Sequence, residues 1–195
     1  MEFDEEIPPE MDITPTPRLL AVLESLDIDP WRCVAEFIDN GLDDFVKAAN
    51  PNGIVKVWYE DRCLFVSDNG SGMTFSQLQD ALKAGYSDKS KADELGLFGI
   101  GFNVATARLG RRVELFTRNK NESRWLYVDL NINNLIKAKK FGVQPRYAYL
   151  DDPIFESGTN IKIHLSKEQI QKFERPAFQK EIARQLGRIY SFILR

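Results

Sequence analysis

Residues 34–49 place acidic and amide side chains together on one side of a predicted amphipathic helix. At about 100° per residue the apolar residues share one side, and Glu36, Asn40, Asp43 and Lys47 recur on the opposite side. A carboxylate, an amide and a second carboxylate are thereby presented together. Such a set can hold a divalent metal ion and a water molecule beside an anionic group. The alternative is a polar side that is only solvated, as on most amphipathic helices.

A second candidate element is Asp68-x-Gly70-x-Gly72, which directly follows an apolar run at 63–67. Glycine lets the backbone approach a flat ligand closely because it has no Cβ. The carboxylate of Asp68 can accept a hydrogen bond from an exocyclic amine, which adenine has and guanine lacks at that position. An ordinary Asp/Asn/Gly turn is the alternative for this stretch.

A third candidate element is the glycine pattern G-x-x-G-x-G at 96–101, which leads into a predicted helix at 98–109. Successive glycine N–H groups and a helix N-terminus can bind phosphate oxygens. The spacing is the reverse of the dinucleotide fingerprint and follows no parallel-strand unit, so a Rossmann fold is not favoured. The chain has no G-x-x-x-x-G-K-[ST] motif, which excludes a P-loop enzyme. A glycine-rich loop or a close helix packing is the alternative.

Two further stretches carry weaker signals. Ser87 and Lys89 lie in a polar segment at 85–97, and a lysine ammonium there could approach a triphosphate. Gly158-Thr159 opens a late strand and could place a hydroxyl at the floor of a pocket. An exposed loop and an ordinary strand start are the alternatives.

The hydrophobic pattern predicts helices alternating with pairs of strands. Helices are expected at about 18–26, 30–50, 74–84, 98–109 and 176–194, and strands at 54–59, 63–67, 112–117, 124–131, 146–150 and 160–165. The segment 85–97 has little periodicity and is expected to be a mobile loop. This order indicates an α+β fold, a two-layer sandwich with helices on one face of a mixed, mostly antiparallel sheet.

Composition indicates a folded intracellular domain. The 195 residues are 43% apolar and 11% aromatic, which suffices for a substantial core. With 26 basic and 29 acidic residues, the chain gives no support to nucleic-acid or membrane binding over its whole surface. Cys33 and Cys63 form no metal spacing and are expected to be reduced core residues. No apolar run approaches the roughly 20 residues of a membrane helix. The acidic, proline-containing residues 1–17 are expected to form a flexible arm, and 18–195 a single domain.

In this order, the motifs resemble the GHKL ATP-binding superfamily, which has the Bergerat fold and includes type II topoisomerase ATPase subunits, ninety-kilodalton heat-shock chaperones and sensor histidine kinases. The resemblance spans residues 36–165. Within the superfamily, the runs AEFIDNGLDD, GYSDKS and LFGIGFNVATARLG are most similar to the MORC ATPases. A self-contained histidine kinase is excluded, because the lone His164 alternates with apolar residues on a strand and is expected to be a surface or satisfied residue.

The resemblance implies a role for each motif. Glu36 would polarise the water that attacks the γ-phosphate, Asn40 would ligate Mg²⁺, and Asp68 would bind the adenine amine. Met73 would line the base pocket, which Thr159 would support. The nucleotide-binding residues implied by the resemblance are Asn40, Asp43, Asp68, Gly70, Gly72, Met73, Ser87, Lys89, Gly96, Leu97, Phe98, Gly99, Ile100, Gly101, Phe102, Asn103 and Thr159. Ser87 and Lys89, with the backbone of 99–103, would close over the triphosphate as a lid.

The resemblance further implies an ATPase that uses ATP and Mg²⁺ and forms an ATP-dependent homodimer, a clamp acting on DNA or chromatin or in genome defence. It would be cytoplasmic in a prokaryote and nuclear in a eukaryote. A heat-shock-type chaperone and an ATP sensor that dimerises without hydrolysis are the alternatives.

Two departures from the family pattern affect these expectations. Residue 44 is Asp where the family usually has alanine, and the family's catalytic lysine comes from a later domain. We therefore expect slow or absent hydrolysis by this chain alone.

Overall fold

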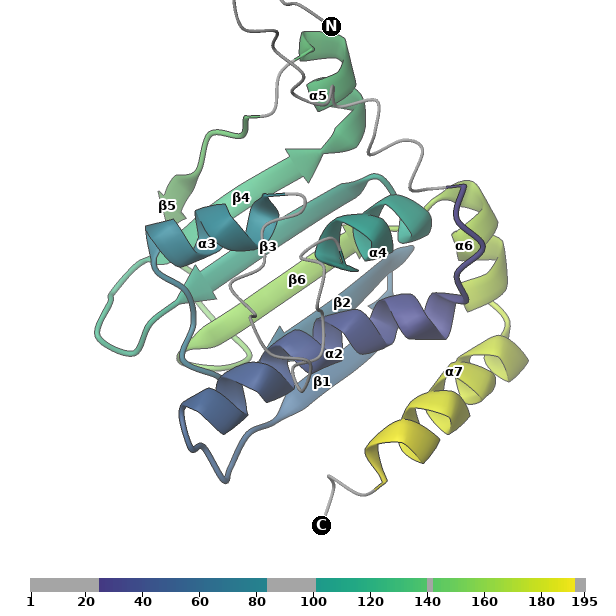
Figure 1. Cartoon of the computed structure of the whole chain (residues 1–195), viewed down its shortest axis with the longest axis horizontal. Helices are drawn as coiled ribbons and strands as arrows, with labels where there is room; N and C mark the ends of the chain where they lie inside the picture. Colours follow the sequence, from purple (N-terminus) through teal and green to yellow (C-terminus); the bar gives the residue numbers. More distant parts are fainter. Residues whose placement is uncertain (1–24, 84–100, 140–141, 192–195) are drawn as a thin grey trace, which may run out of the picture.

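The computed structural model describes residues 25–83, 101–139 and 142–191. In these residues six strands form one sheet in the order β1-β2-β6-β3-β4-β5, and every pairing is antiparallel (Figure 1). The strands are β1 (Val55–Glu60), β2 (Cys63–Asp68), β3 (Arg112–Arg118), β4 (Trp125–Asn131), β5 (Arg146–Ala148) and β6 (Gly158–His164). The late strand β6 lies between the β1–β2 hairpin and the β3–β4–β5 meander, so distant segments of the chain meet at the centre of the sheet.

Helices α2, α3 and α4 lie over one face of this sheet, and α7 packs against α2 (Figure 1). The helices in the described residues are α2 (Pro30–Lys47), α3 (Phe75–Leu82), α4 (Gly101–Leu109), α5 (Ile132–Ala138), α6 (Lys167–Phe173) and α7 (Pro176–Tyr190). None of them is both long and apolar enough to cross a lipid bilayer.

Local sequence signals explain where two of the helices begin. Helix α2 has Pro30 in its first turn, where proline's fixed φ fits and no N–H is needed. Asp29 occupies the N-cap position, although its side chain makes no capping hydrogen bond. Helix α3 begins with a capping box, in which Thr74 and Gln77 each accept a hydrogen bond from the other's backbone N–H.

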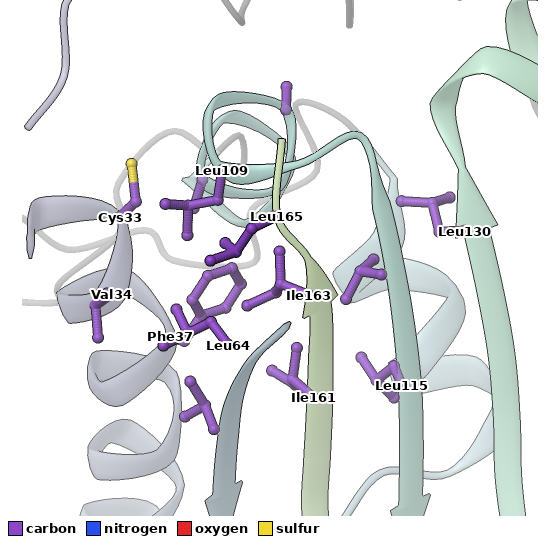
Figure 2. Packing of buried hydrophobic residues seen from close by; sticks show 14 of the residues in the cluster. Cys33, Val34, Phe37, Leu64, Leu109, Leu115, Leu130, Ile161, Ile163 and Leu165 are labelled. Atoms are coloured by element: carbon purple, nitrogen blue, oxygen red, sulfur yellow. The ribbon is translucent and has the colours of Figure 1, made fainter. Parts of the chain in front are cut away.

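The core lies between α2 and the sheet, as Figure 2 shows for Cys33, Val34 and Phe37 of the helix. On the strands the buried residues alternate along the chain, because successive side chains point to opposite faces. Ile161 and Ile163 of β6 are examples, at 7% and 0% exposure. Full burial of such side chains contributes roughly 1.5–3 kcal/mol each. This packing fixes α2 over the central strands and thereby orients its polar side.

The predicted α+β architecture with a mostly antiparallel sheet is confirmed. Both cysteines are buried and free, as expected. His164 is a partly buried strand residue whose Nε2 lies 2.5 Å from Glu114 Oε1. The helices α5 and α6 were not predicted, and α2 ends at Lys47 rather than near residue 50. The arm at 1–17, the loop at 85–97 and, except for residues 25 and 26, the helix at 18–26 lie outside the described residues.

Candidate functional site

Helix α2 approaches the end of strand β2 closely. Gly41 is buried in this contact, and a Cβ added there would lie 3.2 Å from Cγ2 of Val55 and 3.4 Å from Cβ of Asp68. The residue next to it, Asn40, is exposed. The absence of a side chain at Gly41 therefore lets the polar side of α2 lie beside the turn that carries Asp68, so two of the three candidate elements come together.

The Asp68 carboxylate is anchored through one of its two oxygens. Its Oδ1 accepts hydrogen bonds from the backbone N–H of Gly70 at 2.9 Å and of Thr159 at 3.2 Å. The pKa of Asp68 is raised to about 6, chiefly by burial; the two N–H donors lower it, and the nearby Asp44 carboxylate adds to the rise. No described residue donates a hydrogen bond to the other oxygen, Oδ2, which is thus available to a donor on a ligand.

The turn after Asp68 is fastened to strands β3 and β6. Gly72 has a φ of +69°, and a Cβ there would lie 2.2 Å from the carbonyl oxygen of Arg118, so both conformation and space require glycine. The N–H of Met73 donates to Oγ1 of Thr117 at 2.8 Å. That hydroxyl in turn lies 3.2 Å from the carbonyl oxygen of Gly158, to which it donates. These contacts hold the turn in place without any ligand.

The Glu36 carboxylate lies against the first residue of α4. A Cβ added at Gly101 would lie 1.8 Å from Oε1 of Glu36, so only glycine fits there with the carboxylate in this position. The contact puts a negative charge at the positive end of the α4 dipole, which is favourable. Next along α4, Phe102 packs edge-to-face on Phe37 with ring centroids 5.6 Å apart. The catalytic candidate on α2 is therefore held next to Gly101, the last residue of the third candidate element.

The remaining predicted residues differ in where they lie. On α2, Asp43 is partly buried. On α4, Asn103 is 3% exposed, and its side-chain amide donates to the carbonyl oxygen of Leu82 at 3.5 Å, a contact that joins α4 to the end of α3. The hydroxyl of Thr159 lies 3.3 Å from that of Thr117. Ser87, Lys89, Gly96, Leu97, Phe98, Gly99 and Ile100 lie outside the described residues.

The site also contains three residues that the sequence patterns did not assign to it. Thr117 supports the turn from β3, and the hydroxyl of Ser157 donates to the carbonyl oxygen of Gly70 at 3.3 Å. Asp44 accepts a hydrogen bond from the backbone N–H of Ser71. Of these, only Asp44 stood out in the sequence, as a departure from a family pattern.

The chemistry of the donors suits a metal ion that is shared with a ligand. In the part of the chain that the structure describes, no three His, Cys, Asp or Glu side chains form a cluster that could hold a metal. The exposed amide of Asn40, one turn of α2 after Glu36, would supply one oxygen. Mg²⁺ is commonly bound in this way, by few protein oxygens and otherwise by water and phosphate. The residues present therefore fit a magnesium ion that arrives with a phosphorylated ligand.

The class of the protein follows from a family model. The model described as "Histidine kinase-, DNA gyrase B-, and HSP90-like ATPase" matches residues 28–159, which include α2, the Asp68 turn and the start of α4. The chain belongs to this family of ATPases, and its α+β structure with an antiparallel sheet is consistent with the GHKL ATPase fold.

Among individual proteins, the chain is similar to MORC proteins. It is 33% identical over 119 residues to MORC family CW-type zinc finger protein 3 of Mus musculus, a match that covers 56% of this chain and 12% of the mouse protein. It is 38% identical over 88 residues to Protein MICRORCHIDIA 4 of Arabidopsis thaliana, covering 43% of this chain and 11% of that protein. The matched region is thus a small part of these curated relatives, and it supports a MORC-like ATPase module.

Proposed function

We propose that this chain binds ATP with Mg²⁺ and hydrolyses it to ADP and phosphate. The observation that carries the proposal is that α2 contacts two other elements: the turn after Asp68, through Gly41 and Asp44, and the first residue of α4, through Glu36. A site that binds and hydrolyses ATP needs a hydrogen-bond acceptor for the base, a ligand for the metal ion and a carboxylate that polarises water. Asp68, Asn40 and Glu36 are the candidates for these three roles.

The residues have separate roles in this proposal. Asp68 accepts a hydrogen bond from the adenine amine through Oδ2, since Oδ1 is occupied by the N–H groups of Gly70 and Thr159. Asn40 contributes an oxygen to Mg²⁺, which neutralises phosphate charge when bound. Glu36 orients and polarises the attacking water. Phosphoryl transfer depends mainly on such positioning and charge stabilisation, so no covalent intermediate is needed.

Substitutions on α2 test these roles. Asn40→Ala should abolish binding of Mg·ATP measured by calorimetry, whereas Glu36→Ala should retain binding and lose phosphate release. Lys47→Ala, an exposed residue in the last turn of the same helix, serves as the control and should leave binding unchanged. Unchanged affinity of the Asn40 variant for Mg·ATP would refute the metal assignment. Wild-type protein that binds no ATP at millimolar concentration would refute the proposal as a whole.

Turnover should be slow in this chain by itself. The resemblance to GHKL ATPases implies a catalytic lysine from a later domain, so the 195-residue chain is expected to bind ATP more readily than it hydrolyses it. Phosphate release from this chain and from a longer protein that includes the next domain should be compared. A non-hydrolysing sensor remains the alternative if the longer protein also releases no phosphate.

We further propose that ATP closes a lid formed by Ser87, Lys89 and the backbone of 99–103 and brings two copies of the protein together. The proposal follows the family resemblance in the run from Gly85 to Gly110. Size-exclusion chromatography with light scattering should show a dimer with a non-hydrolysable ATP analogue and a monomer without it. A monomer under both conditions, at an analogue concentration shown by calorimetry to saturate the site, would contradict ATP-dependent dimerisation.

The similarity to MORC proteins leads us to propose that the full protein associates with DNA or chromatin, in the nucleus of a eukaryote or the cytoplasm of a prokaryote. The net charge of −3 over 195 residues gives no support to DNA binding over the whole surface of this chain and leaves a local basic patch open. Full-length protein should retard duplex DNA in a gel, and less so as salt increases. A longer protein that binds unfolded polypeptides and no DNA would favour a heat-shock-type chaperone.

A further inference from the structure

The carboxylate of Asp44 links helix α2 to the turn that carries Asp68. Its Oδ2 accepts a hydrogen bond from the backbone N–H of Ser71 at 2.6 Å. A hydrogen bond to an ionised acceptor is about twice as strong as one between neutral groups. The other contact described above between this helix and Asp68 is the apolar approach at Gly41. The bond from Ser71 to Asp44 therefore sets how the turn is oriented on the helix.

Asp44 and Asp68 lie on the same side of Gly70. A Cβ placed on this glycine would be 2.3 Å from Oδ2 of Asp44 and 2.9 Å from Oδ1 of Asp68. The backbone N–H of Gly70 donates to Asp68, and the next N–H, of Ser71, donates to Asp44. Two successive turn residues are thus each held by a carboxylate, and the position of Asp68 depends on both.

This arrangement has two consequences for a base that contacts Asp68. With the turn fixed to α2, Oδ2 of Asp68 keeps one direction, which favours a ligand amine that meets it in that direction. The second negative charge, on Asp44, repels a carbonyl oxygen placed at the same position. A purine with an amino group at carbon 6 is therefore favoured, and a purine with an oxo group there is disfavoured.

We propose that Asp44 is a positioning residue that sets the preference for a 6-amino purine over a 6-oxo purine, acting through the turn of Asp68. The inference rests on the proposed binding of ATP. It requires no contact between Asp44 and the nucleotide.

The test compares ATP with inosine triphosphate, which carries an oxygen in place of the 6-amino group and a hydrogen on N1, with the same sugar and triphosphate. Calorimetry on the full chain gives the ratio of the two affinities for wild type and for Asp44→Ala. The variant should lose about tenfold in affinity for ATP, since a hydrogen bond to a charged group is removed. Its affinity for inosine triphosphate should be unchanged or higher, because the amine contact with Asp68 is absent there and the charge that repels the oxo group is removed.

A second variant, Asp44→Asn, covers the case in which the alanine variant does not fold. Asparagine keeps an oxygen for the N–H of Ser71 and removes the charge, so ATP affinity should be largely retained while inosine triphosphate binds better. Asp152→Asn, which removes an exposed surface carboxylate, is the control and should keep the wild-type ratio. Melting temperatures without nucleotide show whether each variant is folded.

The outcomes separate the inference from the function on which it rests. A wild-type ratio in both Asp44 variants, with ATP binding intact, would overturn the role of Asp44 and leave the proposed function standing. Equal losses for both nucleotides would show that Asp44 only stabilises the fold, and would also overturn the inference. Wild-type protein that binds neither nucleotide would overturn the proposed function together with the inference.

Discussion

Replacing Asp68 by asparagine should remove a pH dependence from the stability of the ligand-free protein. In the folded protein the pKa of this carboxyl is raised to about 6, chiefly by burial, with a smaller rise from Asp44 and an opposing effect of the N–H groups of Gly70 and Thr159. In the unfolded chain the pKa is the ordinary aspartate value, about 3.9. The folded state therefore binds the Asp68 proton more tightly than the unfolded state does.

The sign of the effect follows from this difference in proton binding. Below about pH 4 the carboxyl is protonated in both states, and its contribution to stability is fully present. As pH rises through about 6, the folded protein must ionise a partly buried carboxyl, and the contribution is lost. The two pKa values correspond to roughly 3 kcal/mol lost by pH 7. Asparagine keeps an acceptor oxygen for both N–H donors and carries no charge, so it avoids this loss.

Urea unfolding without nucleotide, from pH 4 to 7.5, measures the effect. The free energy of unfolding of Asp68→Asn should exceed that of wild type increasingly with pH, by about 2–3 kcal/mol at pH 7 relative to the difference at pH 4. Asp152→Asn removes an exposed carboxylate and should follow the wild-type curve, which controls for net charge. Parallel curves for wild type and Asp68→Asn would refute the account of a buried, destabilised carboxylate at this position.

Three further substitutions test the packing around the site. Tyr190→Phe removes a hydroxyl that donates to Asp39 and to a backbone carbonyl of α2. In urea unfolding, the free energy of unfolding should fall by about 1–2 kcal/mol. An unchanged midpoint would mean that this hydroxyl does not fasten α7 to α2. Gly101→Ala should displace the Glu36 carboxylate and reduce phosphate release more than ATP affinity, and equal losses in the two assays would contradict this. Leu109→Ala, at a fully buried position, should lower the free energy of unfolding by about 3 kcal/mol in the same urea assay. A loss no larger than that of a substitution at an exposed position would argue against the core described here.

The elements that carry the site could be predicted from the sequence because their signals are local. The 3.6-residue period of α2 separates the side of Glu36 and Asn40 from the apolar side, and Pro30 marks the start of the helix. The helices α5 and α6 escaped prediction because each has seven residues, too few for a clear period. Their N-caps, Asn131 and Ser166, were the available signals, since each side chain accepts a hydrogen bond from the N–H three residues later.

The contacts that fasten the Asp68 turn could not be predicted, because they depend on where β6 joins the sheet. Thr117 meets Thr159 only because β6 pairs with β3 in one particular register. Ser157 reaches the turn only because β6 also pairs with β2. Neither pairing is between strands adjacent in sequence, and no local pattern specifies it. The sequence therefore predicted the ligand-facing carboxylate and missed the groups that orient it.

The structure also changes what the glycines of this site indicate. Glycine in the sequence motifs suggested room for a ligand to approach the backbone. In the folded chain, Gly70 instead receives the carboxylate of Asp44 and Gly101 that of Glu36, at distances that no Cβ would permit. These glycines are therefore required by the protein's own acidic side chains before any nucleotide binds. It follows that the glycine spacing alone is weak support for a phosphate site, because the space next to Gly70 and Gly101 is already taken by carboxylates of the protein.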